Sequence, residues 1–181
     1  MRVESTGKKR GLVLVYTGNG KGKTTAALGL GLRAVGQGLR VCMIQFMKNS
    51  KNAYGEIEAI KKCFPQWTVI QSGREEFVRK PPSPEDIRLA QDGYRAALKA
   101  LTSGEYDLVI LDEINVAVYF GLLEVQDVLR LIKERNPDVH VVLTGRYAPI
   151  EVRELADTVS EINEIKHHYQ AGVRAIKGIE F

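Results

Sequence analysis

The fold is decided by a glycine-rich stretch near the start of the chain, Thr17-Gly18-Asn19-Gly20-Lys21-Gly22-Lys23-Thr24-Thr25. An apolar run, residues 11–16, precedes this stretch, and an amphipathic run, residues 23–35, follows it. A strand, a glycine-rich turn and a helix in this order form an anion-binding loop, because backbone N–H groups and the positive end of the helix converge on one point. The stretch therefore predicts a site for the phosphates of a nucleoside triphosphate.

The loop departs at one position from the general phosphate-loop pattern GxxxxGK[ST]. The pattern has a glycine where this chain has Thr17, and Lys21 adds a second cation to that of Lys23. The loop glycines permit positive φ and leave room for phosphate oxygens. The hydroxyl of Thr24 is placed to ligate Mg²⁺, so we expect Mg-ATP as the ligand.

A second motif, Leu108-Val109-Ile110-Leu111-Asp112-Glu113, reads as an apolar strand that ends in two acids. In a parallel sheet, the carboxyl end of this strand lies at the same edge as the phosphate loop. One carboxylate can hold Mg²⁺ directly or through water, and the other can assist. Alone the motif is weak, but together with the loop it predicts a nucleotide site.

Short apolar runs alternate with amphipathic ones along the rest of the chain. The expected strands are residues 11–16, 40–47, 67–71, 107–111, 139–144 and 158–162, and the expected helices are residues 23–35, 54–63, 84–101, 124–134 and 149–156. Ser83 is the expected N-cap of the third helix, and residues 175–181 are expected to form a terminal strand or hairpin arm. This order predicts a three-layer α/β fold of the P-loop NTPase, RecA-like class, with a mainly parallel sheet between helices.

Composition narrows the class of protein. The chain has 181 residues and a net charge of +4, which suits anionic small molecules and is too small to argue for nucleic-acid binding. We expect a flexible basic N-terminus over residues 1–10, because Lys8-Lys9-Arg10 fits a frayed end better than a nucleic-acid arm, followed by one domain over residues 11–181. Cys42 is expected in the core. No apolar segment has the length of a membrane span or signal peptide, so we expect a cytoplasmic protein that binds no membrane.

Several further segments can be read together with the loop. They are Thr17-Gly-Asn-Gly-Lys-Gly-Lys-Thr-Thr-Ala-Ala27, Arg33-Ala-Val-Gly36, Val41-Cys-Met-Ile-Gln-Phe-Met-Lys48, Leu111-Asp-Glu113, Thr144-Gly-Arg146, Leu155-Ala-Asp-Thr-Val-Ser-Glu161, Lys166-His-His168, Ala171-Gly-Val173 and Gly178-Ile-Glu-Phe181. The set resembles the ATP:corrinoid adenosyltransferases of the bacterial cobalamin synthesis and salvage type. The loop variant, Thr17 included, and residues 155–161 carry the most specific likeness.

The resemblance implies an activity. Such an enzyme transfers the 5′-deoxyadenosyl group of Mg-ATP to the Co(I) of a reduced corrinoid, such as cob(I)alamin, and releases triphosphate. Because the cobalt attacks the ribose 5′-carbon, the protein must stabilise charge on all three phosphates of the leaving group. No catalytic base is needed, since the nucleophile is the corrinoid metal. The resemblance also implies ATP bound in the reversed direction, a homodimer, and an electron donor such as a flavoprotein.

The resemblance also assigns roles to residues. Lys23, Thr24 and Glu113 are the expected catalytic residues, and Thr24, Asp112 and Glu113 are the expected Mg²⁺ ligands. The expected corrinoid contacts are Arg74, Phe77 and Asn115. The expected ATP contacts are Thr17, Gly18, Asn19, Gly20, Lys21, Gly22, Lys23, Thr24, Thr25, Arg33, Gln45, Lys48 and Arg146.

One stretch departs from the family pattern. Known members carry an aromatic pair after the third strand, whereas Ser72-Gly73-Arg74-Glu75-Glu76-Phe77 has only Phe77. Phe77 beside the cobalt and Phe77 as a plain loop anchor are both open. Two other functions are open as well: a P-loop ATPase or kinase that cleaves at the γ-phosphate with Glu113 as base, and a non-catalytic carrier of nucleotide or corrinoid.

Other residues that could carry chemistry have simpler interpretations. Adjacent histidines point in different directions on most backbones, so His167-His168 is interpreted as a polar segment rather than a chelating pair. Tyr16, Tyr119 and Phe120 are interpreted as core or dimer-contact residues rather than as stacking platforms.

Overall fold

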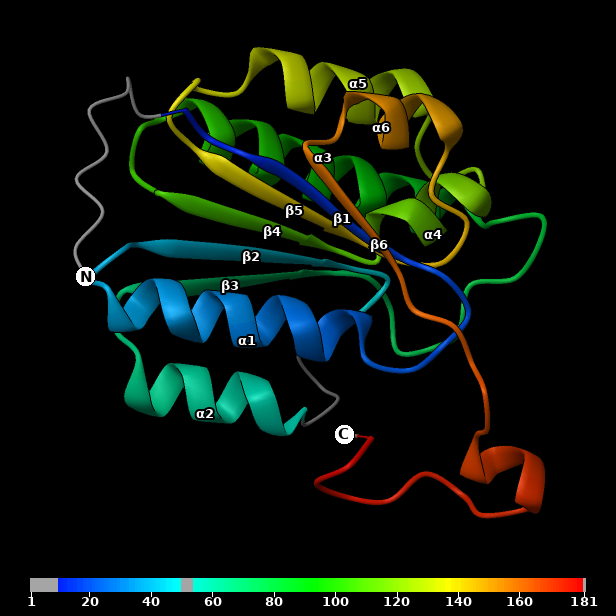
Figure 1. The fold of residues 1–181 in the computed structure, drawn as a ribbon. Coiled ribbons are helices and arrows are strands. Elements are labelled where there is room, and N and C mark those ends of the chain that lie inside the picture. The colour runs from blue at the N-terminus through cyan, green and yellow to red at the C-terminus, as the bar shows by residue number, and fades with distance from the viewer. Residues whose placement is uncertain (1–9, 50–53, 181) are drawn as a thin grey trace.

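The computed structural model describes residues 10–49 and 54–180, which form a six-stranded sheet between two layers of helices (Figure 1). Neighbouring strands are parallel throughout, in the order β3-β2-β4-β5-β1-β6. The strands are β1 (Val13–Thr17), β2 (Val41–Phe46), β3 (Trp67–Ser72), β4 (Leu108–Asp112), β5 (His140–Thr144) and β6 (Thr158–Glu161). The predicted α/β class with a parallel sheet is confirmed.

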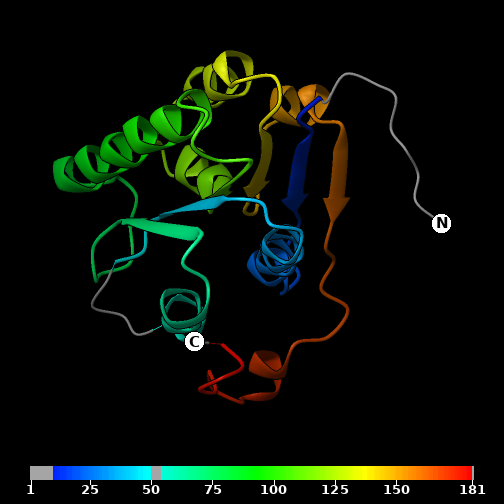
Figure 2. The ribbon, with the colours of Figure 1, turned by 90° about the vertical axis from the view of Figure 1, so that its left-hand side faces the viewer.

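Helices cover both faces of the sheet (Figure 2). One face carries α1 (Lys23–Gly36) and α2 (Gly55–Cys63), and the other carries α3 (Pro84–Thr102), α4 (Ile114–Tyr119), α5 (Val125–Glu134) and α6 (Ile150–Leu155). Successive strand residues point to opposite faces, so the central strands feed two separate cores. Met43 packs on the α1 side and Ile44 on the α3 side, and Cys42 is buried as expected.

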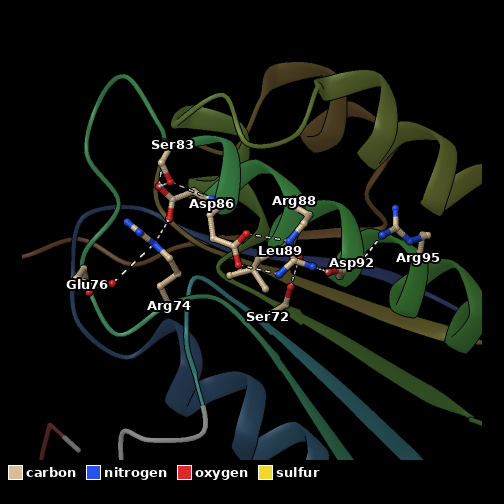
Figure 3. A network of polar contacts seen from close by, with 10 residues as sticks. Ser72, Arg74, Glu76, Ser83, Asp86, Arg88, Leu89, Asp92 and Arg95 are labelled. Atoms are coloured by element: carbon tan, nitrogen blue, oxygen red, sulfur yellow. Dashed lines mark hydrogen bonds and ion pairs between the residues drawn. The ribbon is translucent and has the colours of Figure 1, made fainter.

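The start of α3 follows the sequence prediction in detail. Ser83 caps the helix by accepting a hydrogen bond from the N–H of Asp86, and the Asp86 carboxylate accepts one from the N–H of Ser83. Arg74 donates to the same carboxylate at 2.9 Å, which ties the loop before α3 to the helix (Figure 3). Ser72, at the end of β3, donates to the carbonyl of Leu89.

The observed secondary structure differs from the sequence prediction in several places. The strand expected over residues 158–162 is confirmed as β6, but it lies at the edge of the sheet with all four residues exposed. Residues 175–180 form no strand: residues 177–180 make a turn in which Gly178 adopts a positive φ of 81°, and Ile176 and Ile179 are exposed. The short helices α4 and η1 (His168–Ala171) were not predicted, because so few residues give no clear periodicity.

Near the N-terminus, the described chain begins at Arg10. Residues 1–9 of the expected flexible segment lie outside the described residues, whereas Arg10 forms an ion pair with Asp157 at 2.7 Å. Within residues 10–49 and 54–180, no helix is both long and apolar enough to cross a membrane.

Candidate active site

The phosphate loop connects β1 to α1, as the motif predicts. The backbone turns through Gly18 at φ 93° and Gly22 at φ 120°, a region that favours glycine. A Cβ on Gly22 would meet no atom within 4 Å, so this position leaves open space. Lys23 folds back over the loop and donates to the carbonyl of Gly20 at 2.6 Å. Burial lowers the pKa of Lys23, and the charge of Arg146 acts in the same direction.

Gly18 and Gly20 lie against the segment that follows β6, where a side chain would not fit. The sequence did not reveal this packing. The segment after β6 lies against the loop: Gly20 donates to the carbonyl of Ile162 at 2.7 Å, and Ile162 donates to the carbonyl of Thr17 at 2.9 Å. A Cβ on Gly18 would lie 2.4 Å from the Ile162 oxygen, and one on Gly20 would lie 2.8 Å from Asn163. The loop backbone is thus fixed by its neighbour before any ligand binds.

Asp112 lies fully buried beneath the loop and accepts four hydrogen bonds. Thr24 and Thr144 each donate to Oδ1 at 2.8 Å, and Gln45 and Lys48 donate to Oδ2 at 3.2 and 3.0 Å. The four donors come from α1, β5, β2 and the residues just after β2, so one carboxylate joins all these elements. Burial lowers the pKa of Lys48, but the charge and hydrogen bond of Asp112, together with the charges of Glu113 and Glu56, outweigh it and the net pKa is raised.

Glu113 follows Asp112 but lies in a different environment. It adopts φ 62° at the N-terminus of α4 and its side chain lines the cleft beside the loop. Burial and the charge of Asp112 raise the pKa of Glu113, while Lys48, Lys23 and Arg146 oppose the increase. The two acids therefore differ in their contacts: Asp112 bonds to other parts of the protein, and Glu113 lines the cleft.

The cleft has a volume of about 790 Å³ and surrounds the phosphate loop. Cations, aromatic rings and the C-terminal segment all line it. The lining residues are Asn19, Gly20, Lys21, Gly22, Lys23, Thr24, Thr25, Leu28, Lys48, Tyr54, Gly55, Glu56, Glu113, Val116, Tyr119, Phe120, Arg146, Tyr147, His167, Gly178, Ile179 and Glu180.

Most of the predicted ATP contacts converge on this cleft, and some do not. Residues 19–25, Lys48 and Arg146 line it, whereas Thr17, Gly18 and Gln45 do not, and Thr17 and Gln45 are buried. Arg33 was predicted as an ATP contact, but it lies in the last turn of α1. Ten helical residues span about 15 Å, so the structure does not bring Arg33 to the loop of its own chain.

None of the three predicted corrinoid contacts lines the cleft. Asn115 is fully buried on the inner side of α4, where its Nδ2 donates to the carbonyl of Gly145 at 3.4 Å. Arg74 pairs with Asp86 and Glu76 (Figure 3) and does not line the cleft. Phe77 is 94% exposed, so it anchors nothing in the described part of the chain and leaves its ring free.

The structure adds site residues that sequence reasoning missed. Tyr119, Phe120 and Tyr147 line the cleft, so the first two are not simply core residues. Only their position after the predicted acidic strand and the Thr-Gly-Arg segment could have hinted at this.

The C-terminal segment also reaches the loop. Lys21 pairs with Glu180 at 2.9 Å and donates to the carbonyl of Ile179 at 3.1 Å. The rings of His167 and His168 lie 4.5 Å apart, so the expectation that they diverge is wrong, and His168 lies 3.3 Å from Glu180. Residues so far apart in sequence meet here because the chain after β6 continues past the end of the sheet and its last described residues come to lie near α2 (Figure 2).

Solved structures share the fold at low sequence identity. The flagellar accessory protein FlaH from Methanocaldococcus jannaschii superposes with a TM-score of 0.57 and 14% identity, over 87% of this chain and 73% of that one. The RadB recombinase superposes with a TM-score of 0.55 and 14% identity, over 89% and 78% of the two chains. These similarities support the RecA-like fold alone.

Sequence relatives are much closer. The corrinoid adenosyltransferase of Pseudomonas aeruginosa is 40% identical over 174 residues, which cover 96% of this chain and 85% of that protein. The corrinoid adenosyltransferase of Escherichia coli K12 is 36% identical over 180 residues, or 99% and 90% of the two chains. The sequence profile described as "ATP:corrinoid adenosyltransferase BtuR/CobO/CobP" matches residues 9–181. By this match along nearly its whole length, the chain belongs to the ATP:corrinoid adenosyltransferase family.

Proposed function

We propose that this protein transfers the 5′-deoxyadenosyl group of Mg-ATP to the Co(I) of a reduced corrinoid and releases inorganic triphosphate. The cobalt electron pair forms the new bond to C5′, and the C5′–O bond breaks with its pair on the triphosphate. One observation carries the proposal beyond family membership: four cationic side chains line the cleft at the phosphate loop. They are Lys21, Lys23, Lys48 and Arg146.

These cations suit a leaving group that spans three phosphates. Lys21 and Lys23 belong to the loop itself, while Arg146 follows β5 and Lys48 follows β2. Charge that develops along the whole triphosphate would meet donors on several sides, and fixed donors stabilise developing charge without reorganisation. Lys23, whose pKa is lowered by burial, gains a phosphate as counter-charge in place of the Gly20 carbonyl.

The residues present fit Mg²⁺. This ion takes oxygen ligands, and the Thr24 hydroxyl and the Glu113 carboxylate both line the cleft. Thr24 and Glu113 would hold the ion, and Asp112 would orient Thr24 through their 2.8 Å hydrogen bond. When bound, Mg²⁺ would neutralise part of the charge on the departing triphosphate.

A second function, hydrolysis or transfer at the γ-phosphate, has one observation in its favour. Glu113 lines the cleft with a pKa raised mainly by burial, and a carboxylate with a raised pKa suits a general base. This reaction would give ADP and phosphate, or a phosphorylated acceptor, rather than triphosphate.

Product analysis separates the two functions. The protein is incubated with Mg-ATP and chemically reduced corrinoid, and the nucleotide and corrinoid products are separated. We expect a light-sensitive Co–C product together with an equal amount of triphosphate. ADP and phosphate without that corrinoid product would overturn the proposal. Lys23→Ala should abolish the reaction, and Lys62→Ala, at an exposed position in the last turn of α2, should not.

Other properties follow from the family likeness and stay predictions. We propose a cytoplasmic homodimer that receives electrons from a donor such as a flavoprotein. Light scattering that gives the mass of one chain would contradict the dimer.

A further inference from the structure

Two stacked tyrosines line the cleft, and the reaction proposed above gives them no role. The rings of Tyr119 and Tyr147 lie 4.1 Å apart between centroids at an interplanar angle of 27°. Tyr147 is 51% exposed and Tyr119 is 46% exposed. Tyrosines pack their apolar faces when they can, so a half-exposed pair in a cleft offers a face to a flat ligand.

The ring of Tyr119 has further contacts besides Tyr147. The ammonium of Lys80 lies 3.7 Å from the ring centroid of Tyr119, and Phe120 contacts the same ring edge-on at 5.6 Å. Among the rings that the structure describes, Tyr147 stacks only on Tyr119. Tyr119 is thus a fixed support, and Tyr147 presents its other face.

The turn that carries Tyr147 is anchored to the phosphate loop. Gly145 donates to the carbonyl of Tyr16 at 3.2 Å, and Ala148 donates to the hydroxyl of Thr17 at 3.3 Å. Thr17 is the residue that departs from the general loop pattern, so this departure has a structural use. Its side chain holds the turn that places Arg146 and Tyr147 over the cleft.

The backbone at Tyr147 is strained in a way that a purely structural role does not require. Its φ is 62°, and Met47, Glu113 and Tyr147 are the described non-glycine residues with positive φ. A bulky residue rarely adopts this conformation, and such strain persists where the surrounding structure imposes it. Glu113 and Tyr147, two of the three, line the same cleft.

We propose that Tyr147 stacks on the adenine base of ATP, with Tyr119 as its support and Thr17 as a positioning residue. The proposal rests on ATP binding in the proposed function but not on adenosyl transfer. A phenol ring can cover one ring of a purine, and base–aromatic stacking is a general mode of base binding. Tyr147 also adjoins Arg146, which lines the phosphate part of the same cleft.

The test compares two ligands that differ by the nucleoside. Calorimetry measures the Kd of Mg-ATP and of inorganic triphosphate for the unmodified protein, Tyr147→Ala and Tyr147→Phe. We expect Tyr147→Ala to weaken ATP binding about tenfold or more and to leave triphosphate binding unchanged. Tyr147→Phe keeps the ring and should bind ATP normally. Tyr169→Ala, at a tyrosine that is 74% exposed and does not line the cleft, is the matched control.

Three outcomes would overturn the proposal. Unchanged ATP binding in Tyr147→Ala would show that no base stacks there. Equal weakening of ATP and triphosphate would show that Tyr147 only supports the loop. Unchanged ATP binding with weakened binding of corrinoid alone would assign the ring to the corrinoid. Because none of these readouts needs catalysis, failure of adenosyl transfer would be seen separately.

The positioning role of Thr17 is tested with two variants. Thr17→Val removes the acceptor for the Ala148 N–H, and Thr17→Ser keeps it. We expect the valine variant to bind ATP more weakly with less effect on triphosphate, and the serine variant to bind both ligands as the unmodified protein does. A valine variant that weakens both ligands equally would contradict the positioning role.

Discussion

The buried carboxylate beneath the phosphate loop and the C-terminal segment beside it contact the same short loop with very different strength. Asp112 is fully buried and accepts hydrogen bonds from four side chains, whereas Glu180 pairs with Lys21 where the two side chains are 22% and 40% exposed. Breaking a buried charge network costs about 3–5 kcal/mol, while an exposed ion pair contributes about 0–1 kcal/mol. The first contact thus fixes the loop, and the second is weak enough to exchange for a phosphate.

The largest expected effect comes from the buried side of this comparison. Asp112→Ala leaves Lys48 without its counter-charge and Thr24 without its acceptor. We expect the free energy of unfolding to fall by about 3–5 kcal/mol and adenosyl transfer to be lost. Urea denaturation measures the first effect, with the exposed Asp138→Ala as the matched control. A loss below about 1 kcal/mol would mean that the network is not what fixes the loop.

Glu113 gives an intermediate effect with a pH signature. Its pKa is raised above the ordinary 4.5, so the folded state holds this proton more tightly than the unfolded state does. The stability from that proton is present below the unfolded pKa and is lost as pH rises through the folded pKa. Glu113→Gln should therefore be more stable than the unmodified protein at neutral pH and similar to it at pH 4.

The same variant should need more Mg²⁺. Removing a ligand of the proposed ion should raise the Mg²⁺ concentration for half-maximal transfer about tenfold or more. Stability curves against pH and a Mg²⁺ titration check both effects, and Glu154→Gln serves as an exposed control. If Glu113→Gln loses stability at neutral pH, the assignment of a buried, destabilising charge is wrong.

The smallest effect is expected from the C-terminal segment. Glu180→Gln releases Lys21 from its ion pair, so ATP should bind up to about fivefold more tightly at low ionic strength. Salt screens exposed pairs, and the difference should disappear near 1 M salt. Weaker ATP binding in this variant would instead show that Glu180 helps to hold the ligand.

The same comparison explains which features the sequence could predict. The loop, the acidic strand and Ser83 as a cap are local patterns whose residue types determine the backbone. The site of Asp112 also followed, since the parallel sheet brings the ends of its strands to one edge. These inferences needed no knowledge of remote contacts.

The missed features depend on contacts between remote residues. Tyr147 lines the cleft with a positive φ, a conformation that a sequence does not predict for a tyrosine because bulky residues rarely adopt it. Glu180 meets Lys21 only through the course of the chain after β6. Arg33 was misplaced because a motif match does not give the distance along a helix. Local patterns therefore predicted the phosphate loop and the acidic strand. The positions of Tyr147 and Glu180 at the cleft could be learned only from the structure.

A crystal structure with Mg-ATP tests the central claim most directly, namely that the loop holds a departing triphosphate. We expect the triphosphate in the loop of residues 19–25 with the ribose toward Glu113 and the adenine on Tyr147. The opposite direction, with the γ-phosphate beside Glu113 and the base on the side of Glu180, would contradict the account and favour chemistry at the γ-phosphate.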